Sequence, residues 1–418
     1  MSSTFAQLGV PADLASLLTK QGITSPFPIQ AATLPDALAG RDICGKAPTG
    51  SGKTLAFALA MALRLDQKAK PRAPRGLVLV PTRELAAQVQ KELAPLARAR
   101  GRTVAAVYGG TGYEPQRRAL RQGVDILVAC PGRLEDLIAR RDVGLECVDM
   151  VVLDEADRMA DMGFLPAVRR ILDATRPDRQ TLLFSATLDG DVDKVVRHYQ
   201  RDPRRHEVLA PESQATDVEH LFWHADRTAR VRLTADLLRD HSSAIVFCRT
   251  KHGADRLVTQ LSTAGVDALA IHGNRSQGQR ERALAAFSSG RVRALIATDV
   301  VARGIHVDDV PCIVHFDPPG DIKDYVHRSG RTGRAGATGT VVSLVAQDQV
   351  RSTRILQRSL GFPDRIDRPA GSRTPAPPVT AARPARTFNH RNGNGNGNGN
   401  GYGAPAARGR GRGRVQRP

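Results

Sequence analysis

The sequence is poor in aromatic residues and has no long apolar run. Phe, Trp and Tyr make up 4% of its 418 residues, with a single Trp. It contains no run of about 18 consecutive apolar residues, the length that a membrane-spanning helix needs. The first five residues do not begin a basic region followed by an apolar stretch, as a secretory signal would. We therefore expect a cytoplasmic protein that has no membrane partner.

Cysteine is also scarce, and its spacing excludes the usual zinc sites. The chain has five Cys residues, and no two of them form a Cys-x-x-Cys pair. Most lie in or beside apolar, strand-like runs, which predicts buried thiols that stay reduced in a cytosolic protein. These are Cys44, Cys130, Cys248 and Cys312.

Acidic residues are outnumbered by basic ones. The chain has 61 Lys and Arg against 42 Asp and Glu, a net charge of +19 and a pI near 10.6. This excess favours a polyanionic partner, because basic side chains release the counterions of phosphates. Arg predominates, and it makes bidentate phosphate contacts that Lys does not make. Charge alone leaves open an unrelated basic enzyme.

Short apolar runs alternate with helical stretches twice along the chain. Continuous apolar runs are typical of strands buried on both faces of a parallel sheet. The first series occupies 31–208, the second 218–365, and the Pro-containing segment 209–217 is predicted to be a linker. The fold class is therefore α/β, with two parallel-sheet domains. The predicted strands include 76–80, 125–129, 150–153, 181–184, 244–248, 268–272, 294–297, 312–316 and 340–345.

The C-terminal segment 366–418 has a different composition. Its part 371–418 contains nine Arg, no Lys and no acidic residue, and 392–401 alternates Asn with Gly. Such a segment cannot bury a core, so we expect a disordered tail. The Arg-Gly run 408–414 indicates contact with nucleic-acid backbones. A solubilising linker is the alternative.

A Gly-rich loop between a strand-like run and an apolar helical stretch predicts a phosphate site. Its glycines let backbone N–H groups converge on phosphate oxygens, and the helix N-terminus adds positive potential. Lys53 is expected to hold the β- and γ-phosphates of a nucleoside triphosphate, and Thr54 to ligate Mg²⁺. The loop consists of Ala47, Pro48, Thr49, Gly50, Ser51, Gly52, Lys53 and Thr54.

Two acidic residues follow a later apolar run. Asp154 and Glu155 come directly after the strand-like residues 151–153. Asp154 is expected to hold Mg²⁺, and Glu155 to orient and deprotonate the attacking water. An acidic surface turn would explain the pair alone, but the phosphate loop about 100 residues upstream favours a shared site.

Phosphoryl transfer also needs positive charge near the γ-phosphate. Arg328, Arg331 and Arg334 are spaced by three and follow His327, so a helix or tight turn places them on one side. Arginines delivered in this way accelerate transfer by roughly 10³–10⁵-fold. We expect His327, Arg331 and Arg334 to act at the nucleotide, although a solvated basic face fits the spacing equally well.

With these motifs in this order, residues 3–345 resemble the DEAD-box RNA helicases of superfamily 2. The sequence Asp154-Glu155-Ala156-Asp157 carries much of the resemblance. The resemblance implies two tandem RecA-like domains, with a Q-motif region at 1–30. It also implies ATP and Mg²⁺ as cofactors, and RNA-stimulated ATP hydrolysis that unwinds short RNA duplexes and remodels RNA or RNA–protein complexes. Ribosomal and RNA-decay complexes are compatible partners.

The resemblance also implies roles at the nucleotide. Residues 22–30 are similar to the Q motif, in which Gln30 would read the adenine edge and Phe5 would support the motif by packing. Ile23 stands where many relatives stack an aromatic ring on the base. His306 stands where the family usually has an Asp that contacts the ribose. The other implied nucleotide contacts are Asp157, Ser185, Thr187 and Gly304.

On the RNA side, the resemblance implies contacts to the sugar-phosphate backbone and to 2′-hydroxyls, which distinguish RNA from DNA. The motif from Ser185 to Thr187 would couple hydrolysis to strand separation. The first domain would contribute Pro81, Thr82, Arg83, Gly110, Pro131, Gly132 and Arg133. The second would contribute Arg249, Gln277, Arg280, Thr298 and Arg303.

Two other functions remain open at this point. One is a DNA helicase of the same superfamily, although the motif around Gln30 and the Ala156-Asp157 ending favour RNA. The other is an RNA-binding clamp or annealing chaperone that uses the Arg-Gly tail. In that case the hydrolytic residues would not explain the main function.

Overall fold

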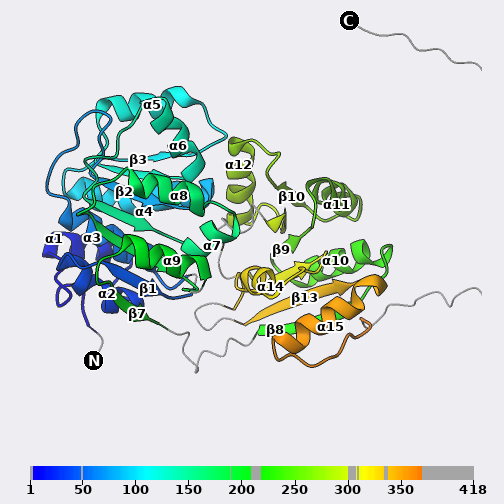
Figure 1. Ribbon diagram of the computed structural model, residues 1–418. Coiled ribbons are helices and arrows are strands. Elements are labelled where there is room, and N and C mark those ends of the chain that lie inside the picture. Colours follow the sequence, from blue (N-terminus) through cyan, green and yellow to red (C-terminus); the bar gives the residue numbers. More distant parts are fainter. Residues whose placement is uncertain are drawn as a thin grey trace, which may run out of the picture. The chain divides into compact units, whose positions relative to one another are not determined.

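The computed structural model describes residues 3–48, 50–188, 190–208, 218–299, 307, 310–333 and 338–369. These residues form two separate sheets, and every strand pairing within them is parallel (Figure 1). The fold-class prediction of two parallel-sheet, RecA-like α/β domains is confirmed. The predicted linker 209–217 and the tail beyond 369 lie outside the described residues. The domain boundaries stay predictions.

The first sheet has seven strands, and four of them are buried along their whole length. β2, β4 and β5 have no polar side chain, and β6 is apolar at its centre, because helices cover both faces of the sheet. The order across the sheet is β3 (Val104–Val107), β4 (Ile126–Ala129), β2 (Gly76–Leu79), β5 (Met150–Leu153), β6 (Gln180–Ser185), β1 (Ile43–Lys46) and β7 (Arg204–Glu207).

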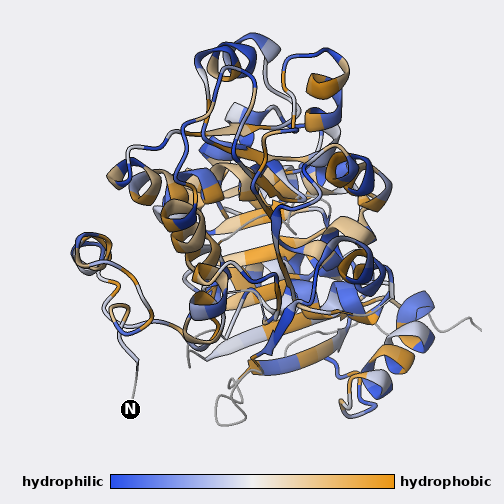
Figure 2. Ribbon diagram, turned by 60° about the vertical axis from the view of Figure 1, so that its left-hand side comes forward, coloured by the Kyte–Doolittle hydropathy of each residue, from blue (hydrophilic) through white to orange (hydrophobic). Residues whose placement is uncertain are grey.

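Successive residues of a strand point to opposite faces, and the first sheet therefore has two cores. In β5, Val152 packs in one core and Val151 in the other. Figure 2 shows apolar strands between helices whose outer sides are largely hydrophilic. The first core also contains α1 (Ala12–Lys20), α2 (Pro28–Leu38), α3 (Lys53–Arg64) and α4 (Arg83–Ala99). The second contains α5 (Tyr113–Gln122), α6 (Pro131–Ala139), α7 (Ala156–Asp161), α8 (Leu165–Asp173) and α9 (Gly190–Tyr199).

The second sheet has six strands. Their order is β10 (Ala268–Ile271), β11 (Ala294–Ala297), β9 (Ala244–Phe247), β12 (Cys312–His315), β13 (Gly339–Val345) and β8 (Val218–His224). One face is covered by α10 (Ala229–Asp240) and α11 (Lys251–Thr263). The other is covered by α12 (Gln277–Ser288), α14 (Ile322–Ser329) and α15 (Val350–Ser359), the last preceded by the 3₁₀ helix η2 (Gln347–Gln349).

The chain stays attached to the second sheet beyond residue 365. The N–H of Asp367 donates to the carbonyl of Phe222 (2.8 Å), and the carbonyl of Asp367 accepts from the N–H of His224 (2.7 Å). These bonds satisfy backbone groups on the outer side of the edge strand β8. No helix in the described ranges is long and apolar enough to cross a membrane.

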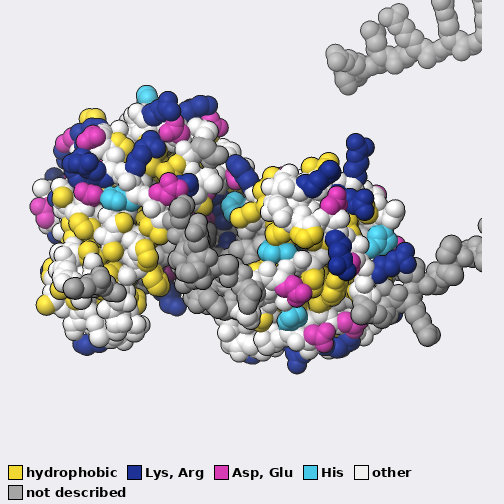
Figure 3. Space-filling model, turned by 90° about the horizontal axis from the view of Figure 1, so that it is seen from below, with side chains coloured by type: hydrophobic (Ala, Val, Ile, Leu, Met, Phe, Trp, Pro, Cys, Tyr) yellow, Lys and Arg dark blue, Asp and Glu magenta, His cyan; other side chains and the backbone are white. Residues whose placement is uncertain are grey.

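Positive charge is not confined to the tail. Nine of the 61 basic residues lie in 371–418, and all 42 acidic residues precede this segment. Residues 1–370 therefore keep a net excess of ten basic side chains. On the face drawn in Figure 3, Lys and Arg side chains are spread among Asp and Glu rather than gathered in one patch.

We expect Phe184 in β6 to be a main stabilising contact of the first domain. Its ring is fully buried, lies 5.8 Å from that of Phe57, and occupies the space beside Gly45 of β1. Phe184→Ala should lower the free energy of unfolding by about 3–5 kcal/mol, measured by urea denaturation. Phe184→Leu should cost less, and Ile355→Ala on the exposed side of α15 should change stability by at most about 0.5 kcal/mol. An equal decrease in the free energy of unfolding in the Phe184→Ala and Ile355→Ala variants would contradict this assignment.

Candidate active site

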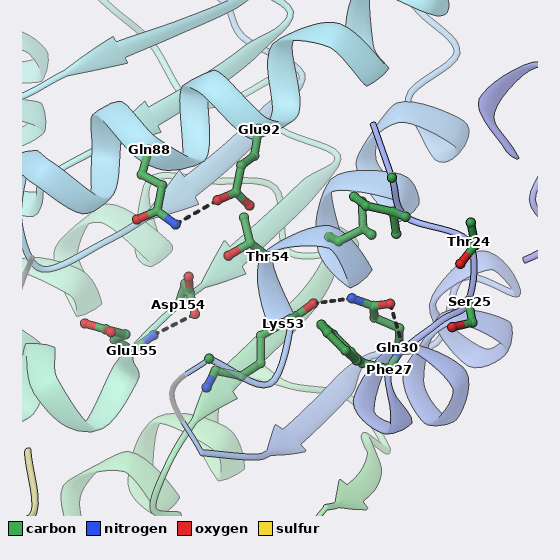
Figure 4. Close-up of a pocket in the computed structure, with 15 residues that line it drawn as sticks. Thr24, Ser25, Phe27, Gln30, Lys53, Thr54, Gln88, Glu92, Asp154 and Glu155 are labelled. Carbon is green, nitrogen blue, oxygen red and sulfur yellow. Dashed lines mark hydrogen bonds between the residues drawn. The ribbon is translucent and has the colours of Figure 1, made fainter. Parts of the chain in front are cut away.

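A cavity of about 420 Å³ lies next to the loops that follow β1 and β5 in the first sheet. This volume is within the range of pockets that hold small ligands. The walls come from the segment before α2, the loop and helix after β1, α4, and the two residues after β5 (Figure 4). The lining residues are Gly22, Ile23, Thr24, Ser25, Phe27, Gln30, Gly50, Gly52, Lys53, Thr54, Leu55, Gln88, Glu92, Asp154 and Glu155.

The loop after β1 has the backbone that the sequence predicts for a phosphate site. Gly50 and Gly52 have φ values of 84° and 82°, which only glycine adopts readily, and α3 begins at Lys53. The ammonium of Lys53 donates to the carbonyls of Ala47 (2.8 Å) and Pro48 (2.7 Å), so it lies within the loop. The helix N-terminus and this lysine together provide an anion site.

Gln30 ties the segment before α2 to the phosphate loop. Its Oε1 accepts from the N–H of Phe27, and its Nε2 donates to the carbonyl of Gly52, both at 2.9 Å. The side chain is only 2% exposed. An amide oxygen has a second lone pair and an amide nitrogen a second hydrogen, so each end keeps capacity for a ligand.

Two residues to which the resemblance assigns roles at the nucleotide pack in or against the first core. Phe5 is buried in the core that contains α2 and α3. Ile23 is half-buried and packs against the same core while also lining the cavity. Thr49 lies outside the described residues.

Asp154 is a deeply buried carboxylate. Its N–H donates to the carbonyl of Leu79 (3.0 Å), and its Oδ1 accepts from the N–H of Glu155 (3.0 Å). Burial and the charge of Glu155 raise the pKa of Asp154 to about 7, although Lys53 opposes the shift. A cation in the cavity would therefore stabilise the ionised form of this carboxylate.

Glu155 is held in a strained backbone conformation. Its φ of 52° and ψ of 53° are left-handed, which costs a non-glycine residue of order 1–3 kcal/mol. Its Oε2 accepts from Nη1 of the buried Arg158 at 3.2 Å. Strain of this kind persists where surrounding contacts fix a residue, and Glu155 lines the cavity together with Asp154.

The cavity is suited to Mg²⁺ that is bound mainly by phosphates and water. Thr54 and Asp154 line it from opposite elements and offer a hydroxyl and a carboxylate oxygen. In the described part of the chain, no group of three or more His, Cys, Asp and Glu side chains could hold a metal by itself. Mg²⁺ commonly binds through one or two carboxylates, waters and substrate phosphates, which fits this donor set.

Asp157 connects the turns that follow β5 and β6. Its N–H donates to Ser185 Oγ (3.1 Å), and its Oδ2 accepts from the N–H groups of Ala186 (3.2 Å) and Thr187 (3.1 Å). Its Oδ1 accepts from the N–H of Arg158 (3.0 Å). The structure thus brings Asp157, Ser185 and Thr187 together behind the acidic pair.

The loops after β2, β3 and β4 lie at one edge of the sheet, because these strands are neighbours. The guanidinium of Arg83 lies so close to Gly110 that a Cβ there would collide with it. Arg133 donates to the carbonyl of Thr111 (3.2 Å) and lies 4.0 Å over the ring of Tyr113. Of the other predicted RNA contacts, Pro131 and Thr82 are buried and Gly132 is exposed. Thr82 also caps α4, because its Oγ1 accepts from the N–H of Leu85 (3.3 Å).

The second sheet has a similar polar edge after β9, β10 and β11, which are also neighbours. Arg249 is exposed, and its N–H donates to Asp317 Oδ2 (2.9 Å). Gln277 and Arg280 lie in the first turn of α12, and Arg280 pairs with Glu84 at 2.7 Å. Thr298 directly follows β11 and is buried.

The arginines that the spacing groups together differ in their surroundings. Arg328 donates to both carboxylate oxygens of Asp299 (2.6 and 2.8 Å) and to the carbonyl of Asp317 (2.8 Å), so it is a buried structural residue. His327 lies in the last turn of α14, whereas Arg331 is buried beyond the end of that helix. Helical spacing therefore does not relate Arg331 to Arg328. Arg303, Gly304, His306 and Arg334 lie outside the described residues.

Seven residues of the cavity wall have no individual role predicted from the sequence. They are Gly22, Thr24, Ser25, Phe27, Leu55, Gln88 and Glu92. Gln88 Nε2 donates to Glu92 Oε1 (2.7 Å), and burial raises the pKa of the Glu92 carboxyl. Gln88 and Glu92 follow Glu84 at intervals of four in α4, so one polar stripe on this helix was the available signal.

We expect loss of the Asp157 carboxylate to free the turn after β6. Asp157→Ala should increase hydrogen exchange at the N–H groups of Ala186 and Thr187 by about 10–100-fold, the effect of losing bonds to a charged acceptor. Hydrogen–deuterium exchange with mass spectrometry measures this. Asp191→Asn, at an exposed site in α9, should leave these groups unchanged. Unaltered exchange in Asp157→Ala would mean that other contacts hold the turn.

Comparison with known proteins supports one family. The DEAD/DEAH box helicase model matches residues 27–195, and the Helicase conserved C-terminal domain model matches 229–336. DEAD-box ATP-dependent RNA helicase 30 of Arabidopsis thaliana is 42% identical over 85% of this chain, which spans 61% of that relative's length. DEAD-box ATP-dependent RNA helicase 20 of the same plant is 39% identical, over 85% of this chain and 73% of that relative.

A solved structure, S. cerevisiae Dbp5 bound to RNA and ADP BeF3, has a similar fold. It is 27% identical with a TM-score of 0.76, and the match covers 88% of this chain and 95% of that chain. The two family models fall on the two sheets in the order in which the chain forms them. By these matches and by its cavity, the chain belongs to the DEAD-box ATP-dependent RNA helicase family.

Proposed function

We propose that this protein hydrolyses ATP in response to RNA, and that it uses the cycle to unwind short RNA duplexes and remodel RNA or RNA–protein complexes. The observation that carries the proposal is the single cavity that Lys53, Thr54, Asp154 and Glu155 share with Gln30. The likeness to Dbp5, which is bound to RNA and ADP BeF3, supports it. The chain spans about three fifths of the length of the first relative, so the activity is inferred for the segment that the two share.

Lys53 and Gln30 define the two ends of the nucleotide. The Lys53 ammonium donates to two carbonyls of its own loop, and it has three hydrogens. A short movement exchanges these carbonyls for the β- and γ-phosphate oxygens of ATP. Gln30 retains a donor and an acceptor that match the edge of adenine. Thr54 and Asp154 would hold Mg²⁺, which supplies charge neutralisation at the phosphates.

Glu155 is proposed to accept the proton of the attacking water. Its strained backbone and its bond to Arg158 Nη1 (3.2 Å) fix the carboxylate at the cavity wall. Such general-base catalysis contributes typically about 10²–10⁴-fold. Arg331 and Arg334 are proposed to neutralise charge that develops at the γ-phosphate, and His327 is proposed to act at the nucleotide as well.

RNA is proposed to bind along the polar edges of the two sheets. Arg83 begins α4, Gly110 lies in the loop after β3, and Arg133 lies in the first turn of α6. All three follow neighbouring strands of the first sheet, and they suit contacts to phosphates. Asp157 links the acidic pair to the turn from Ser185 to Thr187, which gives a physical connection between hydrolysis and the rest of the domain. The net charge of +19 supports a polyanionic partner.

A second activity, RNA annealing, is favoured by the composition of the tail. Nine Arg without any acidic residue in 371–418 would neutralise phosphates and raise the local RNA concentration. Ribosomal or RNA-decay complexes are the proposed settings, and the cytoplasm is the proposed location. The five unpaired cysteines agree with a reducing compartment.

We expect Lys53→Ala and Glu155→Gln to separate nucleotide binding from hydrolysis. Lys53→Ala removes a phosphate contact, so it should weaken ATP binding and turnover together. Glu155→Gln keeps the cavity but removes the base, so ATP should still bind while RNA-stimulated phosphate release falls by about 10²–10⁴-fold. Glu207→Gln, on the exposed edge strand β7, is the control that should change neither. Strong ATP hydrolysis by the wild type without any response to RNA would refute the proposed function.

Removal of the tail should separate the two proposed activities. A chain ending at residue 369 keeps every described residue of the cavity, so its RNA-stimulated ATPase should persist at saturating RNA. Its RNA affinity and strand annealing should fall, and the dependence of log affinity on log salt should become less steep by roughly 0.7–0.9 for each lost phosphate contact. A full-length variant with the four Arg of 408–414 replaced by Gln distinguishes charge from length. If strand annealing persists in both variants, the annealing activity belongs to the folded domains and not to the tail.

A further inference from the structure

Phe27 is the most exposed of the large apolar side chains in the part of the chain that the structure describes. Its side chain is 56% exposed. It occupies the N-cap position of α2, where its ring forms no capping hydrogen bond. Ser, Thr, Asp or Asn at such a position would stabilise the helix, and Phe does not. Neither core packing nor helix capping explains an aromatic ring at this site.

The ring is the only aromatic side chain among the residues that line the cavity. A Cβ added to Gly52 would lie 2.5 Å from Phe27 Cδ2 and would also meet Gln30 Nε2, so the ring and the amide lie against the same glycine. Figure 4 shows Phe27 beside Gln30 and close to Lys53. The glycine therefore permits the ring to rest on the phosphate loop.

Gln30 fixes the position of Phe27 as well as that of the loop. It accepts from the N–H of Phe27 and donates to the carbonyl of Gly52, both at 2.9 Å. The ring thus stands next to an amide side chain whose remaining donor and acceptor match a base edge. Ile23, the other apolar candidate for a contact with the base, is aliphatic and packs partly against the core.

We propose that the ring of Phe27 packs against the base of the bound purine nucleotide, so that Phe27 and Gln30 together form the base-binding end of the cavity. Gln30 supplies polar contacts to the edge of the base, and Phe27 supplies an apolar face. Packing there removes the exposed ring from water, and the π-faces of ring and base attract each other. This inference rests on the proposed ATP site and adds a residue that determines its affinity and base preference.

The test is equilibrium binding of ADP and of inorganic pyrophosphate, both with Mg²⁺, to the full-length protein by calorimetry. Phe27→Leu, which keeps apolar bulk but removes the ring, should weaken ADP binding. Phe27→Thr should weaken it by roughly tenfold or more, the scale of one base–aromatic stack. Pyrophosphate has no base, so its binding should not change in either variant.

Phe27→Thr also separates this role from a structural one. Thr is a good N-cap, so this variant should unfold at an equal or higher temperature than the wild type while it binds ADP more weakly. Phe27→Trp keeps an aromatic ring at this position, so it should bind ADP as the wild type does. ADP should also change the fluorescence of the new indole. The native Trp223 lies in β8 of the second sheet, and its signal is subtracted with the wild type. Ile355→Ala, an exposed apolar site in α15, should bind ADP normally.

Two results would overturn the inference. One is ADP affinity that is unchanged in Phe27→Leu and Phe27→Thr. The other is an equal loss of pyrophosphate and ADP binding, which would make the ring a support for the phosphate loop. In both cases a wild type that binds ADP and responds to RNA would leave the proposed function intact. A wild type that binds no adenine nucleotide would instead refute the proposed function and this inference with it.

Discussion

The parallel pairing of β1 with β6, and of β6 with β5, is the constraint on which the site depends. Parallel strands have their carboxyl ends at the same edge of the sheet, so the residues that follow neighbouring strands lie close together there. The phosphate loop follows β1, the acidic pair follows β5, and Ser185 ends β6. Asp157 then joins the last two turns through its carboxylate. Three segments far apart in the sequence thus form one cavity and the network behind it.

The buried strands could be predicted from the sequence because each is apolar on both faces. The strand-like run predicted before the phosphate loop corresponds to β1. The strands absent from the prediction are β3, β7 and β8, and all three lie at sheet edges. An edge strand has neighbours on one side only and is partly exposed, so its residues need not form a continuous apolar run. β7 consists of Arg, Arg, His and Glu, and no apolar pattern could have revealed it.

Sequence reasoning named the site residues that stand in short local motifs. It missed residues that reach the cavity only because a distant part of the chain folds next to it. Lys53, Asp154 and Glu155 stand in short motifs with a clear physical reason. Glu92 lines the cavity only because α4 crosses it, and the sequence between Glu92 and the loop does not encode that crossing in any short pattern. Spacing alone also does not show which arginines belong to the fold. Arg328, for which no site role was predicted, lies three residues before Arg331 and forms a bidentate bond to Asp299.

The composition of β7 has a consequence for how these molecules behave when crowded. An edge strand presents unpaired backbone groups that a second sheet could extend, and proteins resist this with charged edges. Arg204 and Arg205 occupy this edge; Arg205 is paired with Asp193 of α9 (3.4 Å), and Glu207 with Lys46 on the neighbouring strand. Copies that accumulate on one RNA would bring such edges close together, and these charged side chains would oppose the pairing of one sheet with another. The charges that hide β7 from apolar patterning thus also protect this edge of the sheet.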